Sequence, residues 1–429
     1  MLERRKPLDL LFPLKGGASS EFGVKKEGAA SKLRAAVNLT ADAVKAVSIT
    51  AMEALREGAA FIGIIGEQDE LIDPFHHLDA PIWARDPPVE LLKLAYSYCE
   101  ELTMREAGNF YHSFKYLPEE QRLAMCAVYA FCRRADDIAD GDWQDRFPGS
   151  MGEMDPEAVA YREQLEKLQN KDTILQEDLY LEKITQLFFF RKKLSTCYST
   201  TSSTDPVFLA LKDTVNSYNI PRSVFDDLIT GMEDDLYNNR YRTFDELYVY
   251  CYRVASVVGL MCIEIYGYED PLARKYAESW GIFMQLTNVL RDVGEDIQRN
   301  RVYLPLNELE ENGITEPELN GDVVLNTTWE PYIHHYARRA RTYLDEAKKL
   351  LPLLPRRTRY SPAAMIAFYD KILKQIERQQ GDVFTKRIKL NKIQKLSLAA
   401  AVYLRHRFIP AWLNPLWSGL SRLGLLPDV

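Results

Sequence analysis

The chain has 429 residues, of which 46% are hydrophobic and 27% charged, so a disordered or collagen-like protein is excluded and one large core is permitted. The formal net charge of −8 gives no general electrostatic reason to bind DNA or RNA, and we expect no nucleic-acid partner. The longest stretch without Asp, Glu, Lys or Arg, residues 408–421, is short and contains two prolines, so no membrane-spanning helix is expected.

Periodicity divides the chain into an extension, a helical body and a tail. Residues 1–88 mix glycine, alanine and charged residues and end in a proline-rich segment, which is typical of an extension with a linker. From 89 to 390 the apolar residues recur at intervals of three and four, which predicts an all-α body. Two segments, 142–156 and the Ser/Thr run 194–205, are expected to be surface loops. The six cysteines form no CxxC pair, which indicates reduced thiols and a cytoplasmic protein.

The C-terminal tail, residues 391–429, is basic and aromatic. It combines the apolar segment LSLAAAVYL with Arg405 and Arg407, followed by Trp412 and Trp417. Tryptophan rings and cationic side chains suit the interface of a membrane, so the tail could contact the inner face of a membrane peripherally. A tail that packs on the helical body explains the same composition equally well.

Three stretches place two Asp residues four positions apart: DELID at 69–73, DDIAD at 136–140 and DVGED at 292–296. On a helix such residues lie one above the other, so their carboxylates can share a divalent cation or flank a diphosphate bridged by one. Because this spacing also arises by chance, its context decides. DELID runs directly into Pro74 and has no Arg or Lys in the ten preceding residues, so we interpret it as fortuitous.

DDIAD ends a helix that is expected to begin near Pro118 and to stop at Gly141. Four ionisable or phenolic residues are spaced by four, three and four positions along it and form one polar stripe: Tyr129, Arg133, Asp136 and Asp140. Taken alone, such a stripe could simply be the solvent side of the helix.

DVGED lies on a second helix, WGIFMQLTNVLRDVGED, which is apolar around most of its circumference. Its polar line consists of Gln285, Asn288, Asp292 and Asp296. Since buried carboxylates without partners are costly, a metal, another cation or an aqueous cavity is required. Two such stripes suggest a cavity whose mouth carries two acidic cation sites.

A third segment, TFDELYVYCYRVASVVGLM, mixes tyrosines with small residues. Gly259 should have a reason to lie inside a helix, since glycine there costs about 1 kcal/mol relative to alanine. Close helix packing is one explanation. The other is the wall of a channel for a long apolar substrate, with tyrosine faces available to a carbocation.

The segments YAFCRRADDIADG, GMEDDLYNNRYRTFDELYVYCYRVASVVG and QLTNVLRDVGEDIQRNRVYLP, taken in order, resemble the squalene/phytoene synthase family over residues 92–390. The resemblance implies an all-α isoprenoid-synthase helical bundle around a central cavity, in which two prenyl diphosphates are joined head to head. It implies that Mg²⁺, or alternatively Mn²⁺, is bound by the four aspartates of both motifs: Asp136, Asp140, Asp292 and Asp296.

The same resemblance assigns roles to further residues. It places four side chains near the diphosphates: Arg133, Gln285, Asn288 and Arg291. It places five residues along the substrate channel: Phe110, Tyr129, Tyr250, Val254 and Gly259. The predicted catalytic groups are Arg133, Asp136, Tyr250 and Asp292, and the proton is removed either by Tyr250 or by the released diphosphate.

Within the family, CYRVASVVGLMCIEIYGY and GMEDDL resemble the bacterial presqualene diphosphate synthases of the hopanoid pathway more than the phytoene synthases. The predicted reaction is therefore the condensation of two farnesyl diphosphates to presqualene diphosphate, for which NADPH is not required. The alternative is a phytoene synthase that condenses two geranylgeranyl diphosphates. One departure is Asp234, which stands where the family commonly has methionine.

Other classes of protein fit less well. Head-to-tail prenyltransferases and terpene cyclases share a DDxxD motif, but DVGED followed by NRVYLP is not typical of them. A non-catalytic scaffold of the same fold would be expected to lose carboxylates from one motif, and both motifs are intact. The expected partners are prenyl diphosphate substrates and the downstream isoprenoid enzymes.

Overall fold

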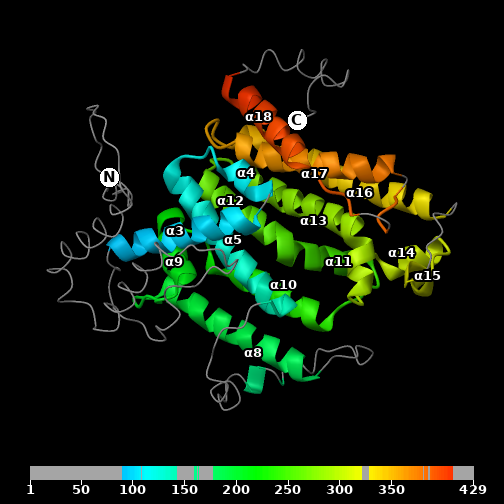
Figure 1. Ribbon diagram of the computed structural model, residues 1–429, viewed down its shortest axis with the longest axis horizontal. Coiled ribbons are helices and arrows are strands. Elements are labelled where there is room, and N and C mark those ends of the chain that lie inside the picture. The colour runs from blue at the N-terminus through cyan, green and yellow to red at the C-terminus, as the bar shows by residue number, and fades with distance from the viewer. Residues whose placement is uncertain are drawn as a thin grey trace, which may run out of the picture. The chain divides into compact units, whose positions relative to one another are not determined.

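The computed structural model shows an all-α protein (Figure 1). It describes residues 89–107, 109–142, 159–161, 163, 177–320, 328–379, 381–384 and 387–408. Within these ranges the one β-bridge is a parallel contact between Arg240 and Val302. The extension 1–88 with its DELID motif, most of the predicted loop 142–156 and the end of the tail lie outside the described residues.

The described helices follow one another along the chain with short connections. They are α3 (Val89–Glu106), α4 (Asn109–Phe114), α5 (Glu119–Asp140), α8 (Glu177–Leu194), α9 (Pro206–Tyr218), α10 (Arg222–Tyr237), α11 (Phe244–Cys251), α12 (Val257–Tyr266), α13 (Leu272–Gln298), α14 (Leu306–Glu311), α15 (Glu316–Asn320), α16 (Trp329–Lys348), α17 (Tyr360–Arg378) and α18 (Lys392–Phe408), with 3₁₀ turns at Ser195–Tyr198 and Leu351–Leu353 and a π-helical turn at Tyr252–Ser256.

These helices belong to two compact units. In the first, formed by the described residues of 1–106 together with 126–131 and 192–219, α3 packs against α9. The hydroxyl of Tyr96 on α3 donates a hydrogen bond to Asp213 Oδ2 on α9 (2.7 Å). The Ser/Thr run predicted as a loop is a 3₁₀ turn followed by irregular chain, and it ends where Asp205 caps α9 by accepting from the Val207 amide (2.9 Å).

The second unit is built around α13, a helix of 27 residues. It contacts α12, α16, α17 and the π-helical turn, and its apolar residues, among them Phe283, Leu286 and Leu290, are inaccessible to solvent. The prediction that this helix is buried is therefore confirmed. Its polar line must face something other than bulk water.

The segments α11, the π-helical turn and α12 form one continuous helix, Phe244–Tyr266. Thr243 caps its first turn, since its hydroxyl accepts a hydrogen bond from the Glu246 amide (3.3 Å). Among the described residues it is the one helix long and apolar enough to cross a membrane by length and composition, and 56% of its most apolar window is buried inside the protein. Much of that burial is against α13.

Two glycines allow this helix and α13 to approach each other closely. A Cβ atom on Gly281 would lie 2.3 Å from the Cα atom of Ser256 in the π-helical turn. A Cβ atom on Gly259 would lie 2.7 Å from the carbonyl oxygen of Ala277. Close helix packing thus accounts for Gly259, and its role in a substrate channel stays a prediction.

We predict that Gly281→Ala destabilises the protein by about 2 kcal/mol or more, because the clash with the Ser256 backbone outweighs the better helix propensity of alanine. Urea unfolding followed by circular dichroism measures the change. Ser279→Ala, which removes a hydroxyl bonded to the Lys275 carbonyl in the same helix, is the control and should cost less than about 1 kcal/mol. Equal stability of Gly281→Ala and the native chain would contradict the close crossing.

Candidate active site

The first acidic pair lies in the last turns of α5. The helix begins at Glu119 and ends at Gly141, as predicted, because Gly141 adopts a φ of 87° and its amide returns to the Asp137 carbonyl (3.0 Å). Arg133 lies one turn earlier, and its guanidinium reaches Asp136 Oδ2 (3.3 Å) and Asp137 Oδ1 (2.5 Å). Arg133 and Asp136 are therefore neighbours, as the polar stripe predicts.

The second pair lies near the end of α13, and two arginines hold its first member. The Asp292 carboxylate accepts from Arg291 Nε (2.8 Å) and from Arg387 Nε (2.9 Å). Arg387 also pairs with Glu295 (2.8 Å). Burial alone would lower the pKa of Arg291, but the hydrogen bond and charge of Asp292 raise it above its ordinary value. This end of α13 is thus a place where cations and carboxylates are packed together.

One turn and two turns before Asp292, two amides continue the polar line. The Asn288 side-chain amide donates to Gln285 Oε1 (3.2 Å). The Oδ1 atom of Asn288 is buried and accepts no hydrogen bond. A buried acceptor of this kind is costly unless a ligand, metal or water completes it.

Between the two acidic pairs lies a third carboxylate, Asp235 on α10. Its two oxygens accept hydrogen bonds from the hydroxyls of Tyr303 (2.8 Å) and Tyr250 (3.0 Å). The rings of these tyrosines are stacked 5.2 Å apart, and Tyr241 lies 5.3 Å from Tyr250. Burial raises the pKa of Asp235, while the nearby charge of Arg301 opposes that rise.

Burial, followed by the negative charge of Asp235, raises the pKa of Tyr250 well above its ordinary value. The Tyr250 phenol is therefore protonated at neutral pH and acts as a donor toward Asp235. Its ring, stacked on Tyr303, is part of a buried aromatic surface next to a negative charge.

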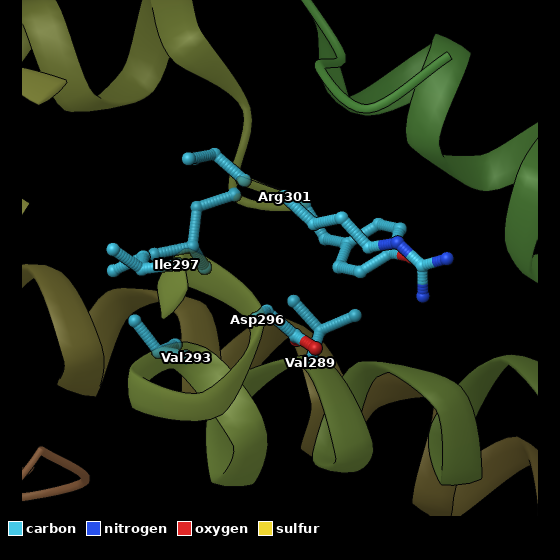
Figure 2. A pocket seen from close by; sticks show the side chains of 8 residues that line it. Val289, Val293, Asp296, Ile297 and Arg301 are labelled. Atoms are coloured by element: carbon cyan, nitrogen blue, oxygen red, sulfur yellow. The ribbon is translucent and has the colours of Figure 1, made fainter. Parts of the chain in front are cut away.

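Arg301 joins the two acidic pairs electrostatically. Its guanidinium lies 3.4 Å from Asp140 Oδ1, and its charge also acts on Asp235 and Asp296. Figure 2 shows Arg301 and Asp296 lining a small pocket whose other walls are apolar, including Val289 and Val293. The four predicted metal ligands therefore surround one centre, although Asp140 itself is exposed and the other three are partly buried.

The electrostatics of this centre fit a divalent cation. Burial and the charge of Asp140 raise the pKa of Asp136 to about 7. Burial and the charge of Asp292 raise the pKa of Asp296 to about 7. In the part of the chain described here, no three His, Cys, Asp or Glu side chains form a closed metal cage. Open pairs of carboxylates match Mg²⁺, which keeps several waters and takes further ligands from substrate phosphates.

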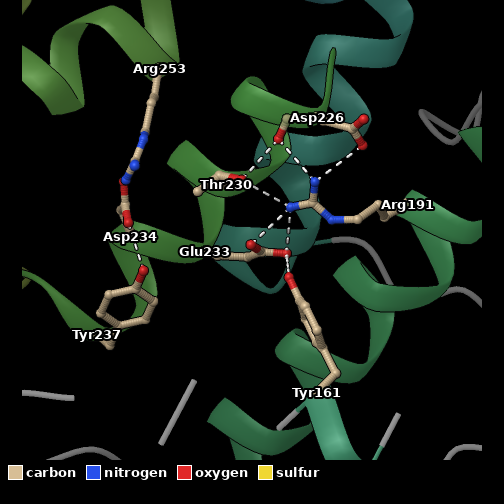
Figure 3. A network of polar contacts seen from close by, with 8 residues as sticks. All are labelled: Tyr161, Arg191, Asp226, Thr230, Glu233, Asp234, Tyr237 and Arg253. Atoms are coloured by element: carbon tan, nitrogen blue, oxygen red, sulfur yellow. Dashed lines mark hydrogen bonds and ion pairs between the residues drawn. The ribbon is translucent and has the colours of Figure 1, made fainter. Parts of the chain in front are cut away.

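The run Glu233, Asp234 and Asp235 on α10 is held by a separate arginine at each position. Arg191 binds both oxygens of Glu233 (2.9 and 3.0 Å) and Arg253 binds Asp234 (2.6 Å), as Figure 3 shows. The remaining carboxylate, Asp235, faces the charge of Arg301. Asp234, the departure from the family pattern, thus fastens α10 to the π-helical turn that carries Arg253.

The other predicted site residues lie in their expected helices. Phe110 is half-buried on α4, with its ring 6.3 Å from that of Phe114. Tyr129 is half-buried on α5, in the first unit. Val254 lies in the π-helical turn against Gly231, where an added Cβ would be 2.8 Å away. A channel role for these three residues stays a prediction.

Comparison with known proteins agrees with this geometry. The family model described as squalene/phytoene synthase matches residues 103–394. The chain belongs to the squalene/phytoene synthase family. It is 35% identical over 336 residues to phytoene synthase 2, chloroplastic, of Oryza sativa subsp. japonica, with 76% of this chain and 75% of that relative covered.

Solved structures of the family share the fold. The crystal structure of a dehydrosqualene synthase in complex with ligand is 27% identical, with a TM-score of 0.60 over 74% of this chain and 99% of that one. The squalene synthase HpnC from Alicyclobacillus acidocaldarius, at 23% identity and a TM-score of 0.55, covers 69% of this chain and 97% of its own. The predicted isoprenoid-synthase fold is confirmed, and as a family member the protein is a prenyltransferase.

Four residues of the centre were not singled out from the sequence: Asp235, Arg301, Tyr303 and Arg387. Three of them stand inside the segments that carry the family resemblance, GMEDDL and NRVYLP. Arg387 has no such signal, because it reaches Asp292 from a segment 95 residues further along the chain. Only the fold brings that guanidinium to the site.

We predict that Arg301→Gln destabilises the protein by about 3 kcal/mol, because partly buried carboxylates lose their shared cation. Guanidinium unfolding without divalent cations measures the loss. Arg299→Gln is the matched control: Arg299 also pairs with Asp140, at 3.7 Å, but its side chain is 64% exposed against 19% for Arg301. That control should cost less than about 1 kcal/mol, and equal losses in both variants would contradict the central role of Arg301.

Proposed function

We propose that the protein is a Mg²⁺-dependent synthase that condenses two geranylgeranyl diphosphates head to head, as a phytoene synthase does. The observation that carries the proposal is the convergence of two acidic pairs on one centre beside a buried tyrosine cluster. Family membership supplies the reaction class. The names of the relatives that are 33–35% identical support the C20 substrate.

Cleavage of an allylic C–O bond requires that the departing diphosphate be stabilised. Bound Mg²⁺ would supply Lewis acidity and charge complementarity for that group, held by Asp136, Asp140, Asp292 and Asp296. The chain adds guanidinium groups beside both pairs, namely Arg133, Arg291 and Arg387. These cations orient a diphosphate and offset its charge, since arginine matches phosphate oxygens in a bidentate manner.

The allylic cation then needs a dry surface that tolerates positive charge. The rings of Tyr241, Tyr250 and Tyr303 form such a surface, because aromatic faces attract cations and exclude water. Asp235 fixes the orientation of two of these rings through their hydroxyls. Since Tyr250 donates its proton to Asp235, we assign Tyr250 an orienting and cation-facing role, and the proton acceptor to the released diphosphate or Asp235.

The condensation of two farnesyl diphosphates to presqualene diphosphate is the second candidate. Segments of the sequence resemble presqualene diphosphate synthases, and the structural relatives are named dehydrosqualene and squalene synthases. The curated relatives nevertheless favour the C20 reading, which replaces the farnesyl preference based on sequence alone. A scaffold without catalysis is disfavoured by the complete set of carboxylates at the centre.

The substrate class is tested by incubating the purified protein with geranylgeranyl or farnesyl diphosphate, with and without NADPH, and analysing products by mass spectrometry. We expect a C40 product from geranylgeranyl diphosphate, loss of turnover with a chelator and recovery with Mg²⁺. A cyclopropyl C30 diphosphate from farnesyl diphosphate alone would support the second candidate. Tight binding of both substrates without diphosphate release would contradict catalysis.

We predict that Asp292→Asn lowers kcat at least about 100-fold, because the amide can neither bind a divalent cation as a carboxylate does nor balance two arginines. Asparagine is preferred to alanine since it retains hydrogen bonds to Arg291 and Arg387. Glu295→Gln is the matched control: it pairs with the same Arg387 at 2.8 Å, is more exposed, and should retain kcat within about threefold. Equal kcat in Asp292→Asn and the native chain would refute the assignment of the second pair.

A further inference from the structure

The surface formed by α18 differs in charge from the rest of the protein. Residues 389–408 contain five basic residues and no Asp or Glu, although the whole chain has a net charge of −8. The helix packs on α17 and α4 (Figure 1). Ala399 and Val402 face that contact and are buried.

The opposite side of α18 is apolar and exposed. Ile393, Leu396 and Leu404 are 79%, 54% and 52% exposed, and Ala400 between them is also exposed. Their spacing of three, four and four puts them on one stripe of the helix. Large aliphatic side chains aligned in this way on a surface mark a docking site rather than scattered exposure.

Arginines flank this stripe at the C-terminal end of α18. Arg356 donates to the backbone carbonyl of His406 (3.4 Å), and Arg359 donates to the carbonyls of Leu354 and Pro352. Burial, then the charges of Arg405, Arg359 and Arg356, lower the pKa of His406 to about 4. Among the described residues neither Arg356 nor Arg359 forms an ion pair, so their positive charge is not balanced by a carboxylate there.

Lysines and aromatic rings flank the stripe on the side of α4. Burial, followed by the charges of Lys395 and Lys115, lowers the pKa of His112, which places these two lysines near one another. The ring of Tyr116 is 45% exposed and lies 5.0 Å from that of Tyr403 on α18. Tyrosines and lysines at the edge of an apolar surface are typical of membrane interfaces.

We propose that this surface, comprising the apolar stripe of α18 with the flanking basic residues of α4 and the α16–α17 turn, docks the protein on an anionic phospholipid bilayer. The aliphatic side chains enter the boundary between headgroups and acyl chains, and the arginines and lysines bind lipid phosphates. The sequence continues into the apolar, tryptophan-containing segment 409–429, which extends the same chemistry. A second copy of the chain fits this surface poorly, because a two-fold contact would place like charges opposite each other.

The test is flotation of the full-length protein with vesicles of phosphatidylcholine alone and of phosphatidylcholine with about 30 mol% phosphatidylglycerol. We expect binding to the anionic vesicles, weakening as salt is raised. The triple variant I393Q/L396Q/L404Q should bind at least about tenfold more weakly, since it removes the aliphatic side chains that enter the bilayer. R356Q/R357Q should lose about fivefold per arginine.

The control variants lie on a different helix and its approach. Val249→Gln changes an aliphatic residue that is 47% exposed, and Arg242→Gln changes an arginine whose side chain is 59% exposed. Both should bind vesicles as the native chain does. Diphosphate release in detergent solution should be equal in all five proteins, because none of these residues belongs to the acidic centre.

Several results would overturn the proposal. One is equal binding of the triple variant, or of the single variant Ile393→Gln together with R356Q/R357Q, to anionic vesicles. Others are binding that is as strong to phosphatidylcholine alone, or displacement by millimolar inorganic phosphate without any salt effect, which would indicate a site for a free anion. Sedimentation showing a dimer that the triple variant dissociates, with no vesicle binding, would assign the surface to self-association instead.

Discussion

The arrangement of the site depends on the balance of buried charge around Arg301. Three carboxylates from three helices, Asp140, Asp235 and Asp296, lie within the field of this one guanidinium. Carboxylates so close to one another repel, and burial penalises each of them, so the helices α5, α10 and α13 can meet only if cations stand between them. The same deficit of positive charge gives the centre its affinity for divalent cations and for the arginines that surround it.

The scaffold keeps these charges in place through contacts that are mainly steric. Gly281 lets α13 touch the π-helical turn, and Arg253 of that turn holds Asp234 on α10. Because Glu233 and Asp234 have their own arginines, Asp235 is left to accept hydrogen bonds from Tyr250 and Tyr303. Packing, ion pairing and the orientation of the aromatic rings are thus consequences of one another, and a π-helical turn at such a place is typical of functional sites.

Much of this could be predicted from the sequence, and the reason is periodicity. The helix stop at Gly141, the buried α13 and the polar lines through Asp136 and Asp292 follow from spacing and from the glycine signal. The partners of those carboxylates could not be predicted, because ion pairs such as Arg387 with Asp292 join residues far apart in the sequence. Gly259 shows the same limit, since its spacing suits a channel wall and a helix contact equally, and only the Ala277 carbonyl reveals the contact. The length of the prenyl chain depends on the depth of the pocket, which periodicity does not encode, and there the names of the relatives favour C20 over the C15 preference drawn from short segments.

The central claim is that two acidic pairs hold divalent cations at one diphosphate-binding centre. It is tested most directly by anomalous diffraction from crystals grown with Mn²⁺ and a non-reactive thio-analogue of geranylgeranyl diphosphate. The account predicts manganese peaks within coordination distance of Asp136 or Asp140 and of Asp292 or Asp296, bridged by the diphosphate, with Arg301 still beside Asp235. Manganese peaks away from these carboxylates, or a diphosphate bound by arginines alone, would contradict it.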